Sequence, residues 1–272
     1  IQWVGGKTRL LSIIKENLPN QYNVYHELFL GGGSLLFHLL PKKAYCSENN
    51  KLLCDLYDII KTKKEKIISD LEDIEEEYLL LDKELRKQYY YSIRKLFNQE
   101  KNSFDKCIYF KFLNKTCFNA LYRENKKGEN NVPFGNGKDP KICDKENIEK
   151  LNKYFNENEI IIQNRDFENL ENMNKGDFVY LDPPYYPLKE DSFTSYTKDG
   201  FMKEDHDRLI HFCKKLDSMG IYFLLSNSNS EYIKEKFLEP QYTIIEVSIS
   251  RTLNSNTKKR NKTPCEILIK NY

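Results

Sequence analysis

The stretch "NVYHELFLGGGSLLFHLL" (23–40) reads as a strand, a glycine turn and a helix in immediate succession. Residues 23–29 are β-type, the three glycines after them permit a tight turn, and residues 35–40 have helical character. A glycine turn between a strand and a helix is a place where α/β proteins hold nucleoside-containing cofactors. The stretch therefore predicts an α/β fold with a ligand site at the carboxyl end of its first strand.

Further β-type runs extend this pattern along the chain. They lie at 43–49, 159–167, 177–185, 220–228, 242–250 and 264–272. Residues 203–219 and 230–238 are predicted helices, and the alternation of strands with helices indicates an open α/β sheet. A short polar loop joins the last two runs, which predicts an antiparallel hairpin at or near the sheet edge.

Residues 61–154 interrupt the alternation. The segment begins with charged, helix-periodic sequence, and through residue 140 it is rich in Asn, Lys and Gly. We expect a helical insertion here, between a first core segment at 1–60 and a second at 155–272. Most of the charge in 61–100 is interpreted as a solvated helix face.

Composition limits the classes of protein that need to be considered. The net charge of +2 excludes a histone-like polycation but leaves room for a local basic face. No apolar run is long enough to span a bilayer. The seven cysteines form no Cys-x-x-Cys pair, which favours reduced thiols in a cytoplasmic protein over a metal site or a disulfide framework. His206 and His211 lack a metal context and are expected at the surface or its boundary.

The residues around the glycine turn favour a nucleoside cofactor. Glu48 follows the second strand, where a carboxylate can accept both ribose hydroxyls of an adenosyl group. The dinucleotide fingerprint is incomplete because Leu36 stands at the position of its last glycine, and such turns also serve only as tight turns. "WVGGKT" (3–8) fits a phosphate-binding loop poorly, since Ile1 stands where that motif needs glycine.

The stretch "FVYLDPPYYPL" (178–188) ends a buried strand with a carboxylate, two prolines and two tyrosines. The prolines restrict the backbone beside Asp182. A carboxylate and a proline carbonyl can accept both hydrogens of an exocyclic amine, while the Tyr185 ring stacks on the base. The nitrogen lone pair would then be free to attack an electrophilic methyl group. The alternative is a rigid turn with a surface acid and a packed tyrosine.

Four segments carry a family resemblance. "WVGGK" (3–7), "FLGGGS" (29–34), "FLNKTCFNALYRENKKGENNVPFG" (112–135) and "DPPY" (182–185) occur in the order found in Dam-type DNA adenine N6-methyltransferases of the D12 class. The chain resembles this family over essentially its whole length. The resemblance implies a Rossmann-like methyltransferase fold with an open, mostly parallel seven-stranded sheet, a catalytic domain of 1–60 and 155–272, and a helical target-recognition insertion at 61–154.

The resemblance also implies the reaction and the residues that carry it. The enzyme would flip adenine out of duplex DNA within GATC and methylate N6, converting S-adenosyl-L-methionine to S-adenosyl-L-homocysteine. The implied catalytic residues are Asp182, Pro183, Pro184 and Tyr185. The implied cofactor contacts are Trp3, Lys7, Phe29, Gly31, Gly33, Ser34, Glu48, Asp166, Phe167 and Asp182. The implied DNA contacts are Phe118, Asn119, Leu121, Arg123, Pro133, Lys258, Lys259 and Arg260.

Several DNA contacts would have distinct tasks. Phe118 would wedge into the base stack, and Arg123 would read a guanine edge as a bidentate donor. Leu121 and Pro133 would suit a thymine methyl. Residues 192–201 resemble a loop that closes over the target base, and 250–266 resembles a basic hairpin that contacts phosphates.

Two departures leave the recognition sequence open. Gln2 stands where the family often has lysine, and Asn136 where it often has arginine. The implied partner is double-stranded DNA, reached in the cytoplasm or nucleoid without a membrane. A cognate restriction endonuclease or solitary action, and a monomer or weak dimer, remain open. Rival interpretations are a methyltransferase for cytosine N4, RNA adenine or a glutamine amide, an inactive DNA-binding relative, and a P-loop nucleotidase.

Overall fold

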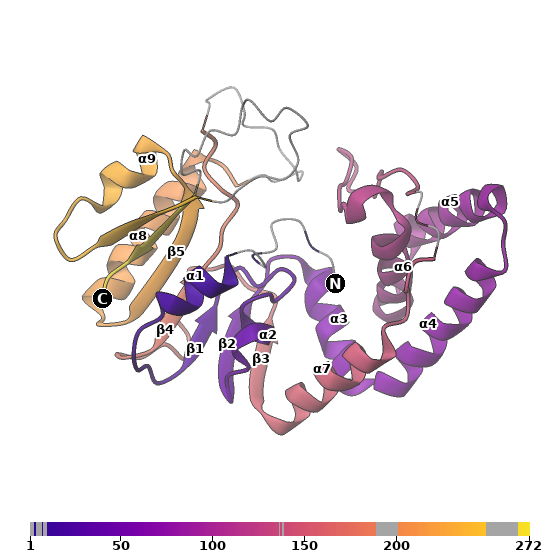
Figure 1. Cartoon of the computed structure of the whole chain (residues 1–272), viewed down its shortest axis with the longest axis horizontal. Helices are drawn as coiled ribbons and strands as arrows, with labels where there is room; N and C mark the ends of the chain where they lie inside the picture. Colours follow the sequence, from indigo (N-terminus) through magenta and orange to yellow (C-terminus); the bar gives the residue numbers. More distant parts are fainter. Residues whose placement is uncertain are drawn as a thin grey trace.

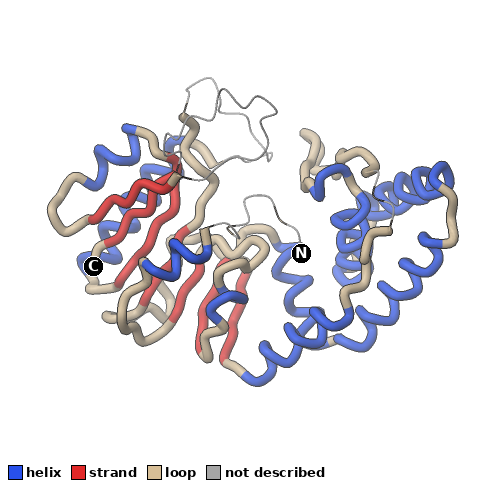
Figure 2. Tube along the Cα trace, in the orientation of Figure 1, coloured by secondary structure: helices blue, strands red, loops and turns tan. Residues whose placement is uncertain are grey.

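The computed structural model describes residues 3, 7, 10–135, 137, 139–188, 201–248 and 266–272. A sheet with flanking helices forms one side of the molecule (Figures 1 and 2). The other side consists of helices α3 to α7, which stand next to the β2–β3 end of the sheet (Figure 1). No helix in the described part of the chain is long and apolar enough to cross a membrane.

Within the described residues the sheet has seven strands in the order β3-β2-β1-β4-β5-β7-β6. They are β1 (Tyr25–Glu27), β2 (Lys43–Ser47), β3 (Glu159–Gln163), β4 (Phe178–Leu181), β5 (Tyr222–Ser228), β6 (Thr243–Val247) and β7 (Glu266–Lys270). Neighbours among β1 to β5 are parallel, and β7 pairs antiparallel with both β5 and β6. The predicted mostly parallel α/β sheet with a C-terminal antiparallel hairpin is confirmed.

Strand β4 shows how the sheet is buried on both faces. Phe178 and Tyr180 belong to a core that includes α1 (Leu11–Glu16) and α3 (Lys51–Thr62). Val179 and Leu181 belong to a second core that includes α8 (Lys203–Ser218). Alternate strand residues point to opposite faces, so a strand covered on both sides must be apolar throughout. This explains the uninterrupted apolar run before Asp182.

The helical side consists of α4 (Lys64–Leu79), α5 (Lys83–Gln99) and α6 (Ser103–Thr116), with α3 and α7 (Lys145–Glu157) next to the sheet. Side chains cap three of these helices by accepting backbone N–H groups of the first turn: Asn50 caps α3, Asp82 caps α5 and Asn102 caps α6. The helices share one continuous hydrophobic core with a face of the sheet. The division of the chain at residues 61 and 154 stays a prediction.

Some elements are shorter than the sequence predicts. The helix after the glycine turn, α2, covers only Leu36–Leu39, because Leu40 adopts a left-handed conformation with φ of 49° that ends it. The segment 230–238 divides into α9 (Glu231–Lys234) and a 3-10 turn at Glu235–Phe237.

The expectation for His206 was wrong. Its side chain is buried on α8, with ring centroids 4.7 Å from Phe201 and 5.2 Å from Tyr186. Burial lowers the pKa of His206 to about 4, so the imidazole is neutral at pH 7. Both aromatic side chains come from the chain before α8, so helix periodicity alone does not reveal the burial. His211 is exposed, as expected.

Candidate active site

Three predicted site segments lie at one edge of the sheet. The glycine turn follows β1, Glu48 follows β2 and Asp182 follows β4. Because β1 lies between β2 and β4 in a parallel arrangement, the three carboxyl ends are neighbours. Ligands of open α/β sheets bind at this edge.

The glycine turn needs glycine at two positions. Gly31 and Gly33 have φ of 49° and 66°, a region that side chains disfavour. A Cβ on Gly31 would lie 3.0 Å from the Trp3 ring, and one on Gly33 would lie 2.4 Å from Phe37. The turn therefore allows Trp3 to pack directly on its backbone. Ser34 is partly buried next to it.

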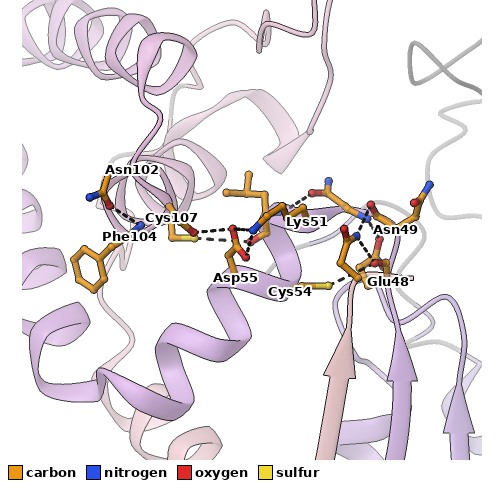
Figure 3. Close-up of polar contacts among 12 residues, drawn as sticks. Glu48, Asn49, Lys51, Cys54, Asp55, Asn102, Phe104 and Cys107 are labelled. Atoms are coloured by element: carbon orange, nitrogen blue, oxygen red, sulfur yellow. Dashed lines mark hydrogen bonds and ion pairs between the residues drawn. The ribbon is translucent and has the colours of Figure 1, made fainter. Parts of the chain in front are cut away.

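Glu48 is held by backbone donors beside this turn (Figure 3). One carboxylate oxygen accepts the Gly31 N–H at 2.7 Å, and the other accepts the Asn50 N–H at 2.7 Å. Burial raises the pKa of Glu48, and these hydrogen bonds oppose the increase. Each oxygen keeps acceptor capacity for a further hydrogen bond, as a ribose-binding acid requires.

Aromatic rings form the side of the site toward α8. Phe29 and Phe167 stack with centroids 5.3 Å apart, and Phe201 contacts both rings. Asp166 forms an ion pair of 2.9 Å with Arg208 of α8. The structure thus brings the predicted Phe29 and Phe167 together and places Asp166 at the exposed rim of the cluster.

The segment Asp182–Tyr185 lies against Lys7. The Lys7 ammonium is 2.8 Å from an Asp182 carboxylate oxygen and 4.6 Å from the centre of the Tyr185 ring. Pro183 is buried and Pro184 is exposed. A cationic nitrogen therefore occupies a position that meets both a carboxylate and an aromatic face. The sequence assigned Lys7 to the cofactor alone and did not indicate this pairing.

The environment of Asp182 perturbs its protonation. Its side chain is 17% exposed, and burial raises its pKa to about 6, against the opposing effect of Lys7. Glu266 contributes a smaller increase. At pH 7 the carboxylate is mostly ionised, so it can accept hydrogen bonds from an amine.

The chain after Asp182 is anchored to β5 and β7. The buried Asn227 side chain accepts the Tyr186 N–H at 3.0 Å, and the Ser228 hydroxyl donates to the Tyr186 carbonyl at 2.5 Å. The Tyr185 hydroxyl donates to Glu266 at 2.9 Å. These contacts hold the two tyrosines in one arrangement relative to the sheet.

The predicted DNA-contacting segment forms a hairpin after α6. Antiparallel bridges join Cys117 to Phe134 and Glu124 to Asn130. Phe118 is 50% exposed, and Asn119 next to it has a positive φ of 53°. The rest of the hairpin displays further predicted contacts, of which Arg123 and Pro133 are exposed and Leu121 is partly buried.

Side chains of helix α5 hold this hairpin by hydrogen bonds to its backbone. The Tyr90 hydroxyl and the Arg94 guanidinium both donate to the Val132 carbonyl, at 2.9 and 2.7 Å. Asn98 exchanges two hydrogen bonds with the Asn130 backbone. The exposed residues therefore stand on a fixed backbone.

Comparison with known proteins identifies the family. The family model of the D12 class N6 adenine-specific DNA methyltransferases matches residues 3–253. The chain belongs to this family. It is 43% identical over 286 residues to type II methyltransferase M.MjaIII of Methanocaldococcus jannaschii, a match that covers all of this chain and 98% of that protein.

Other relatives of this D12-class methyltransferase have consistent names. Type II methyltransferase M1.LlaDCHI of Lactococcus lactis subsp. cremoris is 38% identical, over all of this chain and 94% of that protein. The DNA adenine methylase of Vibrio cholerae is 30% identical, over 96% of this chain and 92% of that protein. The protein is an adenine-specific DNA methyltransferase, which acts on DNA and requires a methyl donor. The sheet is consistent with the methyltransferase fold implied by the resemblance.

Sequence reasoning missed one acid of the D12-class site. Glu27 is buried at the end of β1, where one of its oxygens accepts the Tyr25 hydroxyl at 2.7 Å and the Leu36 N–H at 3.0 Å. Burial raises its pKa to about 8, with a further contribution from Asp182. A carboxylate at the end of a buried strand, shortly before the glycine turn, was the available signal. Glu27 links β1 to the first turn of α2 and so supports the glycine turn.

Other predictions lie outside the described residues. They concern Gln2, Asn136, Lys258, Lys259, Arg260, most of the segment 192–201 and nearly all of 250–266. Among the residues that the structure does describe, no cluster of three or more His, Cys, Asp and Glu side chains is arranged to hold a metal ion.

Proposed function

We propose that this methyltransferase transfers a methyl group from S-adenosylmethionine to adenine N6 within GATC in duplex DNA, after flipping the adenine out of the helix. The observation that supports this most is the contact of Lys7 with both Asp182 and the Tyr185 ring. The exocyclic amine of adenine is an N–H donor like the Lys7 ammonium, so it needs the Asp182 acceptor, and the plane of the base needs a flat ring face such as that of Tyr185.

The residues at the sheet edge fit S-adenosylmethionine. Glu48 retains acceptor capacity toward two ribose hydroxyls, and Phe167, stacked on Phe29, offers an aromatic surface for the adenine ring. Trp3, packed on Gly31, and Ser34 border the same turn. When bound, S-adenosylmethionine supplies an electrophilic methyl group on a sulfonium centre.

The protein's own groups prepare the target amine for attack. Lys7 moves away from Asp182 when the flipped base enters, and the base takes its place between the carboxylate and Tyr185. Asp182 and the Pro183 carbonyl then accept the two N6 hydrogens, which orients the nitrogen lone pair away from the ring. A proton leaves to water after transfer, because the alkylated nitrogen is acidic.

The hairpin of residues 117–134 is proposed to read the DNA. Its exposed Phe118 is placed to enter the base stack at the vacated position. Arg123 is proposed to donate to a guanine edge, and Leu121 with Pro133 to contact a thymine methyl. We assign residues 61–154 as the recognition unit because α5 and α6 carry this hairpin.

A labelling assay tests the proposal. The protein is incubated with methyl-labelled S-adenosylmethionine and duplexes that contain GATC, a one-base variant of it, or no related site. We expect label on adenine N6 in the GATC duplex alone. Label on adenine in another sequence would refute the GATC assignment, and label on cytosine would refute the chemistry assigned to Asp182.

A role in restriction–modification is a second proposal. It is supported by two relatives that are named type II methyltransferases. In that case a nuclease encoded with this protein would cut unmodified DNA at the methylated sequence and leave modified DNA intact. Equal cutting of both DNAs by that nuclease would contradict the pairing.

A further inference from the structure

Tyr122 lies between two residues that are proposed to contact DNA, but its side chain turns toward the sheet. The centroid of its ring lies 5.4 Å from that of the Trp3 ring and 5.7 Å from that of the Phe110 ring on α6. Arg123, the next residue, is exposed and bonds to Asn131 across the hairpin at 2.6 Å. Because successive side chains of an extended segment point to opposite sides, Tyr122 packs against Trp3 and Phe110 while Arg123 faces the exposed side of the hairpin.

Two chains of contacts run from Tyr122 to the glycine turn. Through the first, Tyr122 packs on Trp3, whose ring lies 3.0 Å from the position that a Cβ of Gly31 would take. Through the second, the Asn50 side chain opposes the rise in the Tyr122 pKa, and the Asn50 N–H donates to Glu48. Glu48 also accepts the Gly31 N–H, so both chains of contacts end at Gly31.

The hydroxyl of Tyr122 is tied to the hairpin itself, because the phenol donates to the Glu124 carboxylate. The Asn50 side chain, whose amide oxygen accepts the Leu52 N–H, opposes the rise in the Tyr122 pKa. Burial and this carboxylate raise the pKa of Tyr122, which keeps the phenol a neutral donor. One side chain thus connects a hairpin carboxylate with the Trp3 ring beside the glycine turn.

The first turn of α3 is also held from the helical side (Figure 3). Lys51 pairs with Asp55 at 2.6 Å, and Asp55 accepts the Ser103 hydroxyl of α6 at 2.6 Å. The turn that carries Asn50 is therefore braced between Glu48 and α6. Because this helix end is fixed, a movement of the hairpin would move Tyr122 and, with it, the residues around Glu48 and Gly31.

We propose that Tyr122 is a positioning residue that couples DNA reading by the hairpin to cofactor binding at Gly31 and Glu48. The inference rests on the proposed function of both sites. DNA that engages Leu121 and Arg123 would fix the Tyr122 side chain, which would hold Trp3 and Asn50 in the arrangement that binds the cofactor. Coupling between two ligands is reciprocal, so the cofactor would equally tighten DNA binding.

Binding measurements on the full chain test this inference. The dissociation constant of sinefungin, a donor mimic, is measured with and without a saturating GATC duplex for wild type, Tyr122→Ala and Tyr122→Phe. We expect the duplex to tighten sinefungin binding within the range of about 5–150-fold in wild type. The ratio of the dissociation constant without the duplex to that with the duplex should fall to about twofold or less in Tyr122→Ala. It should take an intermediate value in Tyr122→Phe, which keeps the ring contact.

Tyr89→Phe is the matched control. It removes the hydrogen bond of 2.7 Å from the Tyr89 hydroxyl to the Glu77 carboxylate, which lies among the helices and away from the glycine turn. The factor by which the duplex tightens sinefungin binding should be the same in this variant as in wild type. Thermal melting verifies that each variant is folded, and Tyr122→Phe remains informative if Tyr122→Ala is not.

The outcomes separate this inference from the proposed function. Failure of wild type to bind sinefungin or the duplex would refute the assigned sites themselves. If both ligands bind, an unchanged ratio in the Tyr122 variants overturns the coupling role, even where each affinity is reduced. A wild-type ratio of one overturns it as well.

Discussion

The Asp182 site and the hairpin of residues 117–134 are built in different ways. Asp182 follows a strand that is buried on both faces, its side chain is 17% exposed, and the chain after it is anchored to β5 and β7. The hairpin presents Phe118 with half of its surface exposed, on a backbone held by α5. The proposed chemistry depends on the sheet, whereas the proposed recognition depends on exposed side chains that can change without disturbing the sheet. Substitutions should therefore affect turnover in one region and specificity in the other.

The largest expected effect is that of Asp182→Ala. Loss of the proposed N6 acceptor should lower kcat by at least about 100-fold, while DNA affinity changes less than about threefold. Single-turnover methylation and duplex binding measure the two quantities. Asp70→Ala, which breaks an exposed pair with Lys66 of 2.6 Å on α4, is the control and should change neither. Equal losses of binding and turnover would contradict the role of Asp182.

Arg123→Ala should affect specificity instead. Removing a bidentate contact should reduce discrimination at one guanine by about 1–3 kcal/mol, or roughly 5–150-fold in relative kcat/KM. Duplexes that differ only at that base pair measure the ratio. Lys127→Ala alters an exposed cation in the turn of the same hairpin and should weaken all duplexes similarly. A uniform loss with Arg123→Ala would make this residue a phosphate contact.

Lys7→Gln should move the pH dependence of the reaction. The proposed acceptor must be ionised, so kcat/KM should fall as pH drops through the Asp182 pKa of about 6. Lys7 opposes the raised pKa, so its neutralisation should raise that pKa further and shift the acid limb upward, by about one unit. Near pH 6 activity would then be several-fold lower.

The control for this pH profile is Lys43→Gln. It breaks a pair of equal length, 2.8 Å to Glu159, at the opposite end of β2 from Glu48. Its acid limb should coincide with that of wild type. An acid limb that stays in place or moves to lower pH in Lys7→Gln would show that Asp182 does not control the profile.

The smallest effect should come from Tyr90→Phe, which weakens the support of the hairpin. It removes one of two donors to the Val132 carbonyl and should lower the free energy of unfolding by about 1 kcal/mol. The melting temperature should drop by roughly 2–4 °C. Tyr91→Phe, at a partly exposed neighbouring position, is the comparison. Equal melting temperatures for the two variants would show that the Tyr90 hydroxyl does not stabilise the hairpin.

Much of the fold could be predicted from the sequence because it depends on local patterns. Alternating apolar runs indicated the strands, and two of them identified the antiparallel hairpin of β6 and β7. Glu48 and Asp182 could be singled out because each directly follows a strand, and the ends of parallel strands meet at one edge. The bounds were less accurate, as the short α2 shows, because a left-handed Leu40 carries no clear signal.

Contacts between distant segments could not be predicted. The Lys7–Asp182 pair and the Tyr185–Glu266 hydrogen bond join residues far apart in sequence, and each side chain alone resembles many others. The sequence placed Tyr122 inside the predicted DNA-reading segment, and nothing in that segment indicates that its ring packs on Trp3. The burial of His206 depends in the same way on rings supplied by Tyr186 and Phe201.

A structure of the protein with sinefungin and a GATC duplex would show directly whether Asp182 holds a flipped base. We expect the target adenine to lie outside the helix, with its N6 about 3 Å from both the Asp182 carboxylate and the Pro183 carbonyl. Its ring should lie on Tyr185, and Lys7 should have left the carboxylate. An adenine that remains stacked in a cognate complex, or an N6 held elsewhere while the Lys7–Asp182 pair stays intact, would contradict this expectation.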